Sequence, residues 1–298
     1  MKVLLSIDSS EISETVIADV ERRPWPPDTT VCVLSVLDMF ALTSSVGYLE
    51  MFWKQETAAL EEFVQRVADR LAKKGIKTLA TVREGYPNIA IVDYANEWGA
   101  DFVFVGSHGH GGLVRFFVGS VAKAVLHGTK CSVAIVRGAV APGRPENEGM
   151  RILLATDGSE YSDAAARSIA KRPWSNGSQI RVVSAAGISF PTVDLSYTTG
   201  PLNEQVRQVS IDQAKDAVAE ATRILEPTGL VTSSEVVLGN PKTRLLDEAT
   251  EWKADLIVAG SHGRRGISRV LLGSVAEGVA MRAHCSVEVI RERGAQKA

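Results

Sequence analysis

The chain has 298 residues, of which 45% are hydrophobic and 23% charged, and its 33 basic and 35 acidic side chains give a formal net charge of −2. This near-neutral balance gives no electrostatic reason to expect nucleic acid or an anionic membrane as a partner, because both require a concentrated basic surface. The length suits two domains of ordinary size.

The first predicted element is the short apolar run VLLSI that begins at Val3 and stops at Asp8. It is too short for the hydrophobic region of a signal peptide, and no uninterrupted run of about 18 apolar residues occurs elsewhere. We therefore expect a cytoplasmic protein without a membrane-spanning helix. The cysteines Cys32, Cys131 and Cys285 show no CxxC spacing, which predicts buried free thiols rather than disulfides or a structural zinc site.

The first half of the chain alternates between strand and helix patterns. Its predicted strands are short apolar or β-branched runs that begin at Val3, Thr30, Lys77, Asp101 and Ser132. Continuous rather than alternating hydrophobicity indicates strands that are covered on both faces. Between the second and third of them, Glu56–Lys73 places its apolar residues on one stripe at helical spacing.

The second half repeats the first. Its predicted strands begin at Arg151, Gln179, Val231, Asp255 and Ser286. Without a gap, residues 106–137 align with residues 260–291, and 15 of these 32 positions are identical. A repeat of this kind indicates two copies of one domain. Residues 138–149 are rich in Gly, Pro and charge, as linkers are, so we expect domains at 1–140 and 150–298.

This order of elements predicts an α/β fold with two tandem Rossmann-like domains. Each domain should hold a five-stranded parallel sheet with helices on both faces, because right-handed crossovers between parallel strands place the helices there. Ligands of such sheets bind at the carboxyl ends of the strands.

A glycine pattern follows the fourth predicted strand of each copy. Gly106 and Gly109 are followed after nine residues by Gly119-Ser120-Val121, and Gly260 and Gly263 by Gly273-Ser274-Val275 at the same spacing. Glycines beyond a strand let an anion approach backbone N–H groups, and a helix start adds further donors and the positive end of its dipole. One such loop is more often a plain turn. Two copies at the ligand end of a parallel strand favour phosphate binding.

Residues near these loops carry less specific signals. Ser274 and Glu277 fit a capping box, which supports a helix start in copy two. Arg115, Arg264, Arg265 and Arg269 could meet phosphate oxygens, and a solvated helix face explains each of them equally well.

Other reaction classes lack their motifs. The sequence contains no GxxxxGK[ST] loop, no GxGxxG after a first strand and no GxSxG elbow. Ser107-His108 and Ser261-His262 suggest a nucleophile and a base, but sequence neighbours rarely face each other and no third member is evident. His108 and His110 could bind a metal only in copy one, because Arg264 replaces His110 in copy two. We therefore predict neither a catalytic residue nor a metal site.

The pattern G-x2-G-x9-G-[ST] in both copies resembles the ATP-binding signature of the universal stress protein family. The resemblance covers nearly the whole chain as a tandem pair and implies the strand order 3-2-1-4-5. It also implies adenine-side and ribose-side contacts from the aspartate that ends strand one and from a residue near the end of strand two. The binding residues so expected are Asp8, Val36, Gly106, Gly109, Gly119, Ser120 and Val121 in copy one, and Asp157, Ala185, Gly260, Gly263, Gly273, Ser274 and Val275 in copy two.

The resemblance implies a nucleotide-binding regulator of the stress response with one ATP pocket per domain. AMP or ADP could replace ATP, and Mg could accompany the nucleotide. A slow ATPase and a scaffold that works without nucleotide are the alternatives. The apolar fifth strands SVAIVR and SVEVIR would be sheet edges, which invite pairing. We therefore expect an intramolecular pseudo-dimer through these strands, and a further homodimer is open.

Overall fold

The computed structural model describes residues 1–23, 25–38, 49–108, 118–138, 149–187, 201–264 and 272–292. The chain divides into two compact units, of which unit 1 spans Met1–Glu146 and unit 2 spans Asn147–Arg291. Residues 139–148, which include most of the expected linker, lie outside the described residues. Each unit is considered by itself below.

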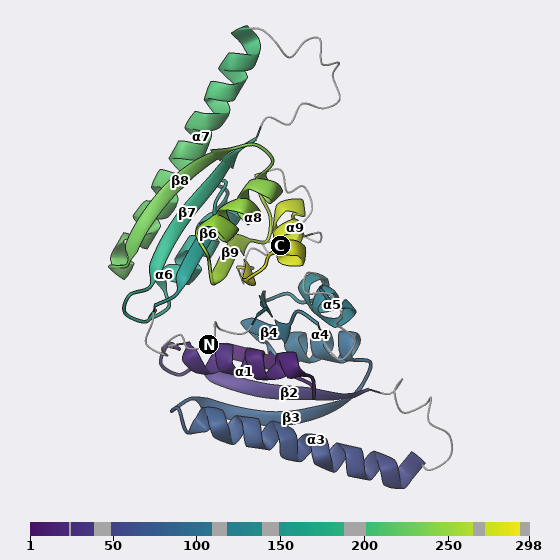
Figure 1. Cartoon of the computed structure of the whole chain (residues 1–298). Helices are drawn as coiled ribbons and strands as arrows, with labels where there is room; N and C mark the ends of the chain where they lie inside the picture. The colour runs from purple at the N-terminus through teal and green to yellow at the C-terminus, as the bar shows by residue number, and fades with distance from the viewer. Residues whose placement is uncertain are drawn as a thin grey trace. The chain divides into compact units, whose positions relative to one another are not determined.

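Unit 1 alternates strands and helices, as its apolar runs predict. Its elements in chain order are β1 (Lys2–Ser6), α1 (Glu11–Arg22), β2 (Thr30–Asp38), α3 (Leu49–Ala72), β3 (Lys77–Gly85), α4 (Pro87–Trp98), β4 (Phe102–Gly106), α5 (Ser120–Gly128) and β5 (Ser132–Val136) (Figure 1). The strands of the unit pair in parallel, in the order β3-β2-β1-β4-β5. The expected order 3-2-1-4-5 is confirmed.

Unit 2 repeats this topology. Its elements are β6 (Arg151–Ala155), α6 (Glu160–Ala170), β7 (Gln179–Ala186), α7 (Pro201–Leu225), the 3-10 helix η2 (Glu226–Thr228), β8 (Val231–Leu238), α8 (Pro241–Glu251), β9 (Leu256–Gly260), α9 (Ser274–Arg282) and β10 (Ser286–Ile290). The strands are again parallel, in the order β8-β7-β6-β9-β10.

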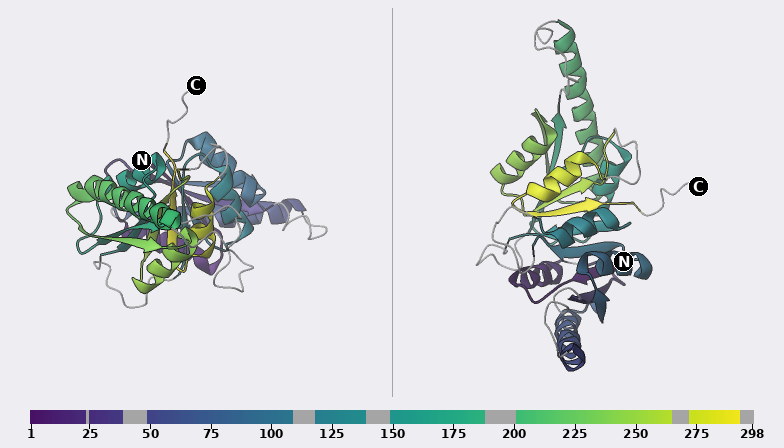
Figure 2. Two further views of the ribbon diagram at one scale, coloured as in Figure 1. Left: turned by 90° about the horizontal axis from the view of Figure 1, so that it is seen from above. Right: turned by 90° about the vertical axis from the view of Figure 1, so that its right-hand side faces the viewer.

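Helices cover both faces of each sheet. In unit 1, α1 and α3 share one face, where the Arg70 guanidinium donates to the carboxylates of Glu21 and Glu14. The helices α4 and α5 pack against each other on the other face. In unit 2, α6 packs on α7, and α8 packs on α9 (Figure 1). The N-terminal ends of α3 and α7 run past the ends of the strands that they cover (Figure 2).

Burial along the strands explains why their sequence patterns differ. The central strands β1 and β6 bury every residue after the first, as continuous apolar runs predict. The strands β3 and β8 lie at the far edge of their sheets and are partly exposed along most of their length. The carboxyl ends of β1 and β4, and of β6 and β9, lie side by side because these strands are paired in parallel.

Candidate functional site

The first glycine of each predicted loop is required by packing. A Cβ at Gly106 would lie 2.8 Å from Cγ2 of Ile12, on the first turn of α1. A Cβ at Gly260 would lie 2.5 Å from the carbonyl oxygen of Tyr161, on the first turn of α6. These two glycines therefore let the strand end approach the preceding helix, and this role does not require a ligand.

The structure joins the strand end to the second glycine group in both units. The Gly119 N–H donates to the Ser107 carbonyl at 2.7 Å, and the Gly273 N–H donates to the Ser261 carbonyl at 2.8 Å. Residues twelve positions apart in the chain are thus in direct contact at the carboxyl end of β4 and of β9. Gly109 lies outside the described residues, as do Arg115, Arg265 and Arg269.

The helices that follow these glycines begin without a side-chain cap. Gly119 is the N-cap of α5 and Gly273 the N-cap of α9, and neither helix start has a side-chain capping hydrogen bond. Ser159 caps α6 and Asn240 caps α8 through their side-chain oxygens, whereas α1 and α4 also begin without a side-chain cap. The predicted capping box is therefore wrong, because Ser274 is already the first helical residue. The first N–H groups of α5 and α9 lack the side-chain acceptor that α6 and α8 have.

Each strand end also carries a serine and histidine in contact. Ser107 Oγ lies 2.9 Å from His108 Nδ1, and Ser261 Oγ lies 3.0 Å from His262 Nδ1. The expectation that these neighbours would not face each other is wrong in both units. The His262 ring packs on Tyr161 with 4.9 Å between ring centroids, and its Nε2 is buried without a hydrogen-bond partner in the described structure. A carboxylate that would complete a catalytic relay is not bonded to His262 there.

The two aspartates at the ends of β1 and β6 organise the loops that follow them. Asp8 Oδ1 accepts hydrogen bonds from the Ser10 N–H at 3.0 Å, from the Ser10 hydroxyl and from the Ser13 hydroxyl at 2.8 Å. Asp157 Oδ1 accepts from the Ser159 N–H at 3.1 Å and from its hydroxyl at 2.6 Å. Both carboxylates therefore hold the start of the next helix.

The residues expected beside the adenine lie at the ends of the second strands. Val36 pairs in register with Arg83, and Ala185 pairs with Val237. Both Val36 and Ala185 are partly exposed. Val36 and Ala185 lie on β2 and β7, which pair with β1 and β6, the strands that lead to Asp8 and Asp157. The residues predicted to contact the nucleoside therefore lie at one end of each sheet.

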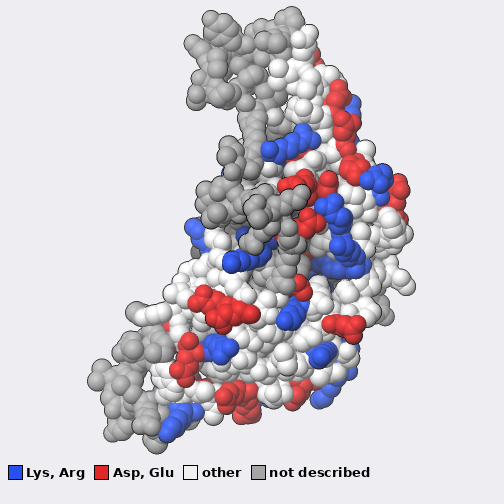
Figure 3. All heavy atoms as spheres, turned by 180° about the vertical axis from the view of Figure 1, so that it is seen from behind, with Lys and Arg blue, Asp and Glu red and all other residues white. Residues whose placement is uncertain are grey.

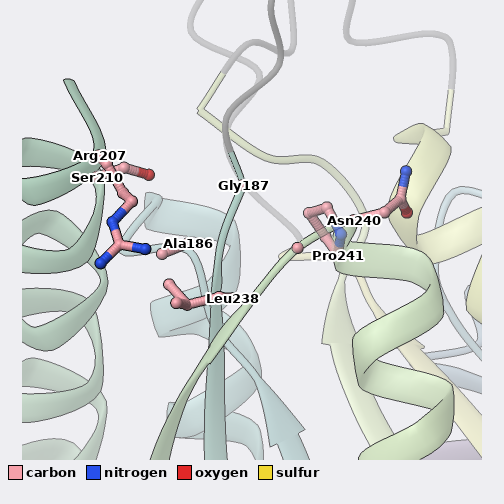
Figure 4. Close-up of a pocket in the computed structure, with 8 residues that line it drawn as sticks. Ala186, Gly187, Arg207, Ser210, Leu238, Asn240 and Pro241 are labelled. Atoms are coloured by element: carbon pink, nitrogen blue, oxygen red, sulfur yellow. The ribbon is translucent and has the colours of Figure 1, made fainter. Parts of the chain in front are cut away.

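A cavity that the sequence did not predict lies next to Ala185. Its volume is about 310 Å3, and it opens between α7 and the carboxyl ends of β7 and β8. Figure 4 shows the Arg207 side chain extending from α7 toward Ala186 (Figure 4). The lining residues are Ala186, Gly187, Arg207, Ser210, Leu238, Gly239, Asn240 and Pro241. No spacing rule links α7 to the turn after β8, so only the folded chain brings them together.

The cysteines are buried free thiols, as expected. Cys32 Sγ lies 3.4 Å from the Tyr94 hydroxyl. Burial raises the pKa of the Cys32 thiol, and the hydrogen bond with Tyr94 opposes this shift. Burial and then the contact with Cys32 raise the pKa of Tyr94 to about 12.

The described surface shows no segregation of charge on the face seen in Figure 3. Basic and acidic side chains are interspersed over the described surface that Figure 3 shows (Figure 3). Among the described residues, no group of three or more His, Cys, Asp or Glu side chains could hold a metal ion. None of the described helices combines the length and the apolar character needed to span a bilayer.

Both halves of the chain match the same family of known proteins. Residues 1–137 and 150–291 each match the Universal stress protein family. A universal stress protein of Mycolicibacterium smegmatis is 26% identical over 297 residues, covering 98% of this chain and 97% of that protein. One from Methanocaldococcus jannaschii is 32% identical over 150 residues, covering 49% of this chain and 85% of that protein.

Solved structures show the same fold. The crystal structure of a universal stress protein from Archaeoglobus fulgidus superposes with a TM-score of 0.65 at 22% identity. The alignment covers 98% of this chain and 96% of that chain.

Proposed function

Because the chain belongs to the universal stress protein family, we propose that each of its two units binds an adenine nucleotide and that this binding regulates a stress response. The observation that carries the proposal is the pair of uncapped helix starts at α5 and α9. Each lies against a glycine loop at the ligand end of a parallel sheet.

The phosphates of the nucleotide would lie at the start of α5 and α9. The backbone N–H groups of Ser120 and Val121, and of Ser274 and Val275, point along the helix axis toward that end. Their donors and the positive end of the helix dipole favour an anion, and the serine hydroxyls add a further donor to each site. ATP, ADP and AMP all fit this chemistry, and Mg would accompany ATP as its counter-ion.

The adenosine part would lie toward the second strand. In unit 1, the partly exposed Val36 supplies an apolar contact beside Asp8. In unit 2, Ala185 takes the place of Val36 and offers less apolar area, so adenine binding there should be weaker. The conformation of Asp157 adds a second difference between the units.

An equilibrium titration with labelled ATP tests the proposal. We expect two sites per wild-type chain, one site in Gly119→Val, and none in Gly119→Val/Gly273→Val. A Cβ at Gly119 would lie 3.5 Å from His108 Cα, which is an ordinary contact. A Cβ at Gly273 would lie 3.1 Å from His262 Cα, so the backbone there must shift by a few tenths of an ångström. Circular dichroism checks that the variants are folded.

A matched control separates the site from the helix. Ala124→Val adds bulk to α5 beyond its first turn and should keep both ATP sites. Wild-type stoichiometry in the double variant would remove the phosphate assignment. A wild-type chain that binds no nucleotide would favour the scaffold function instead.

A further inference from the structure

The long helix and the end of the third strand meet through different residues in the two units. The alignment that matches the buried Leu71 of α3 with the buried Leu225 of α7 also matches Trp53 with Arg207. In unit 1, the Trp53 indole N–H donates to Glu84 Oε1 at 2.9 Å. This bond ties α3 to the carboxyl end of β3. Unit 2 has a charged, flexible side chain in place of the indole.

The strand registers show two further replacements at the same place. Leu37 pairs with Glu84 in unit 1, and the equivalent pair in unit 2 is Ala186 with Leu238. Ala186 is buried like Leu37 but lacks the three outer carbon atoms of the leucine side chain. Leu238 has a hydrocarbon side chain where unit 1 has a carboxylate. Unit 2 therefore loses a large buried group here and gains an apolar wall.

The cavity of about 310 Å3 in unit 2 lies where these replacements occur. Its volume is at the lower end of the range of about 300 to 1,000 Å3 for ligand pockets, which suits a small molecule. Ala186, Leu238 and Pro241 supply apolar wall, and Arg207 and Ser210 belong to α7 (Figure 4). The cavity thus combines a hydrocarbon lining with one cationic side chain.

Arg207 has donors available for a ligand. Its Nε lies 3.4 Å from Glu204 Oε2, and the two side chains are 48% and 67% exposed. An ion pair this exposed contributes little to stability, so a ligand can replace it at small cost. Within the described parts of the chain, neither Nη atom of Arg207 forms a hydrogen bond or an ion pair. The guanidinium can therefore present its planar pair of donors to an acid group.

The cavity is separate from the proposed nucleotide site. Neighbouring residues of a strand point to opposite faces of the sheet, so Ala185 and Ala186 do not face the same space. Ala186 faces α7, which lines the cavity. The proposed phosphate site is at the start of α9, which packs with α8 on the other face of the sheet.

We propose that this cavity of unit 2 binds a small organic carboxylate, with the acid group on Arg207 and a compact apolar body against Ala186 and Leu238. A guanidinium and a carboxylate match in a planar arrangement of two hydrogen bonds. The apolar wall favours a hydrocarbon body over an inorganic anion, because only the former buries apolar surface. Unit 1 has a tryptophan and a leucine at the equivalent positions and should not bind this ligand.

Benzoate is a suitable probe, because it joins one carboxylate to a small apolar ring. An NMR titration of the isotope-labelled full chain should show saturable shifts at the amides of Gly187, Leu238 and Gly239. Benzamide has a similar shape without the charge, and inorganic phosphate has charge without an apolar body. Each should bind at least tenfold more weakly than benzoate, which is the scale of one charge-assisted hydrogen bond. Saturating ATP should leave the benzoate affinity unchanged.

Two variants remove the two parts of the site. Arg207→Gln keeps a good helix former and should weaken benzoate binding at least tenfold. Ala186→Leu introduces the residue that unit 1 has at this place and should abolish binding by filling the cavity. The matched control Arg223→Gln removes an exposed arginine near the other end of α7 and should leave the affinity unchanged. Thermal unfolding checks that each variant is folded.

The outcomes separate this proposal from the proposed nucleotide function. Equal affinities for benzoate and benzamide, or an unchanged benzoate affinity in Arg207→Gln, would overturn it. Competition between ATP and benzoate would show that the cavity belongs to the nucleotide site and would overturn it as well. Saturable shifts of similar size at the amides of Leu37 and Glu84 would contradict the assignment to unit 2. Benzoate binding without any ATP binding would refute the nucleotide function alone.

Discussion

At the scale of single residues, the glycines of each loop have two different structural roles, in packing at Gly106 and in a backbone hydrogen bond at Gly119. The glycine spacing is consistent with the fold, in which the Gly119 N–H donates to the Ser107 carbonyl. It did not show that Gly106 is needed for packing against Ile12, because nothing in a GxxG pattern records the neighbouring helix. The Ser–His contacts were also missed, because they depend on a turn of the backbone between adjacent residues.

The pair of Cys32 and Tyr94 gives a prediction on pH dependence. The pKa of Tyr94 is about 12 in the folded chain against an ordinary value of 10.0. Between these values the unfolded chain releases the proton and the folded chain keeps it. The stabilisation is therefore complete below pH 10 and is lost as the pH rises to 12. Urea unfolding at pH 9 and pH 11.5 should show a loss of stability that is smaller in Tyr94→Phe. Tyr86 is 54% exposed, so Tyr86→Phe should lose as much stability between these pH values as the wild type.

At the scale of helices and strands, most of the fold could be predicted. Continuous apolar runs gave the central strands, since a strand covered on both faces must be apolar throughout. The helix starts were harder to predict. A serine and a glutamate at capping-box spacing suggested a cap at Ser274, but the structure uses Gly273 and leaves the helix without a side-chain cap. The spacing alone cannot tell a helix that a serine caps from one that begins after a glycine without a side-chain cap.

The contrast between capped and uncapped helices gives a second prediction. Asn240 accepts the Lys242 N–H at 3.0 Å, so Asn240→Ala should lower the free energy of unfolding by about 1 kcal/mol and leave ATP stoichiometry unchanged. Ser274→Ala removes no capping bond, so it should leave stability unchanged and weaken ATP binding at unit 2. Thermal unfolding and ATP titration of both variants measure the two effects. Equal losses of stability would mean that Ser274 has a structural role.

At the scale of the whole molecule, the repeat was the most informative feature of the sequence. It predicted two copies of one topology, and both units have it. The repeat could not predict that the copies differ at Asp157, because the aspartate itself is the same in both. The difference arises because Ser13 donates to Asp8, whereas its counterpart Ser162 contacts the hydroxyl of Thr156, which stands where copy one has Ile7.

The last prediction concerns how the two copies associate. We propose that β5 and β10 pair in antiparallel fashion within one chain. Within its own unit each of these strands is the last in the strand order, next to β4 or β9, and an apolar strand at that place in a sheet favours pairing with another strand. Separately produced fragments 1–146 and 147–298 should therefore form a 1:1 complex in sedimentation experiments. Antiparallel pairing would place Cys131 and Cys285 at opposite ends of the ribbon, so a mild oxidant should not join them in the intact chain. Fragments that stay apart when mixed, or a ready disulfide between these cysteines, would contradict the proposed pairing.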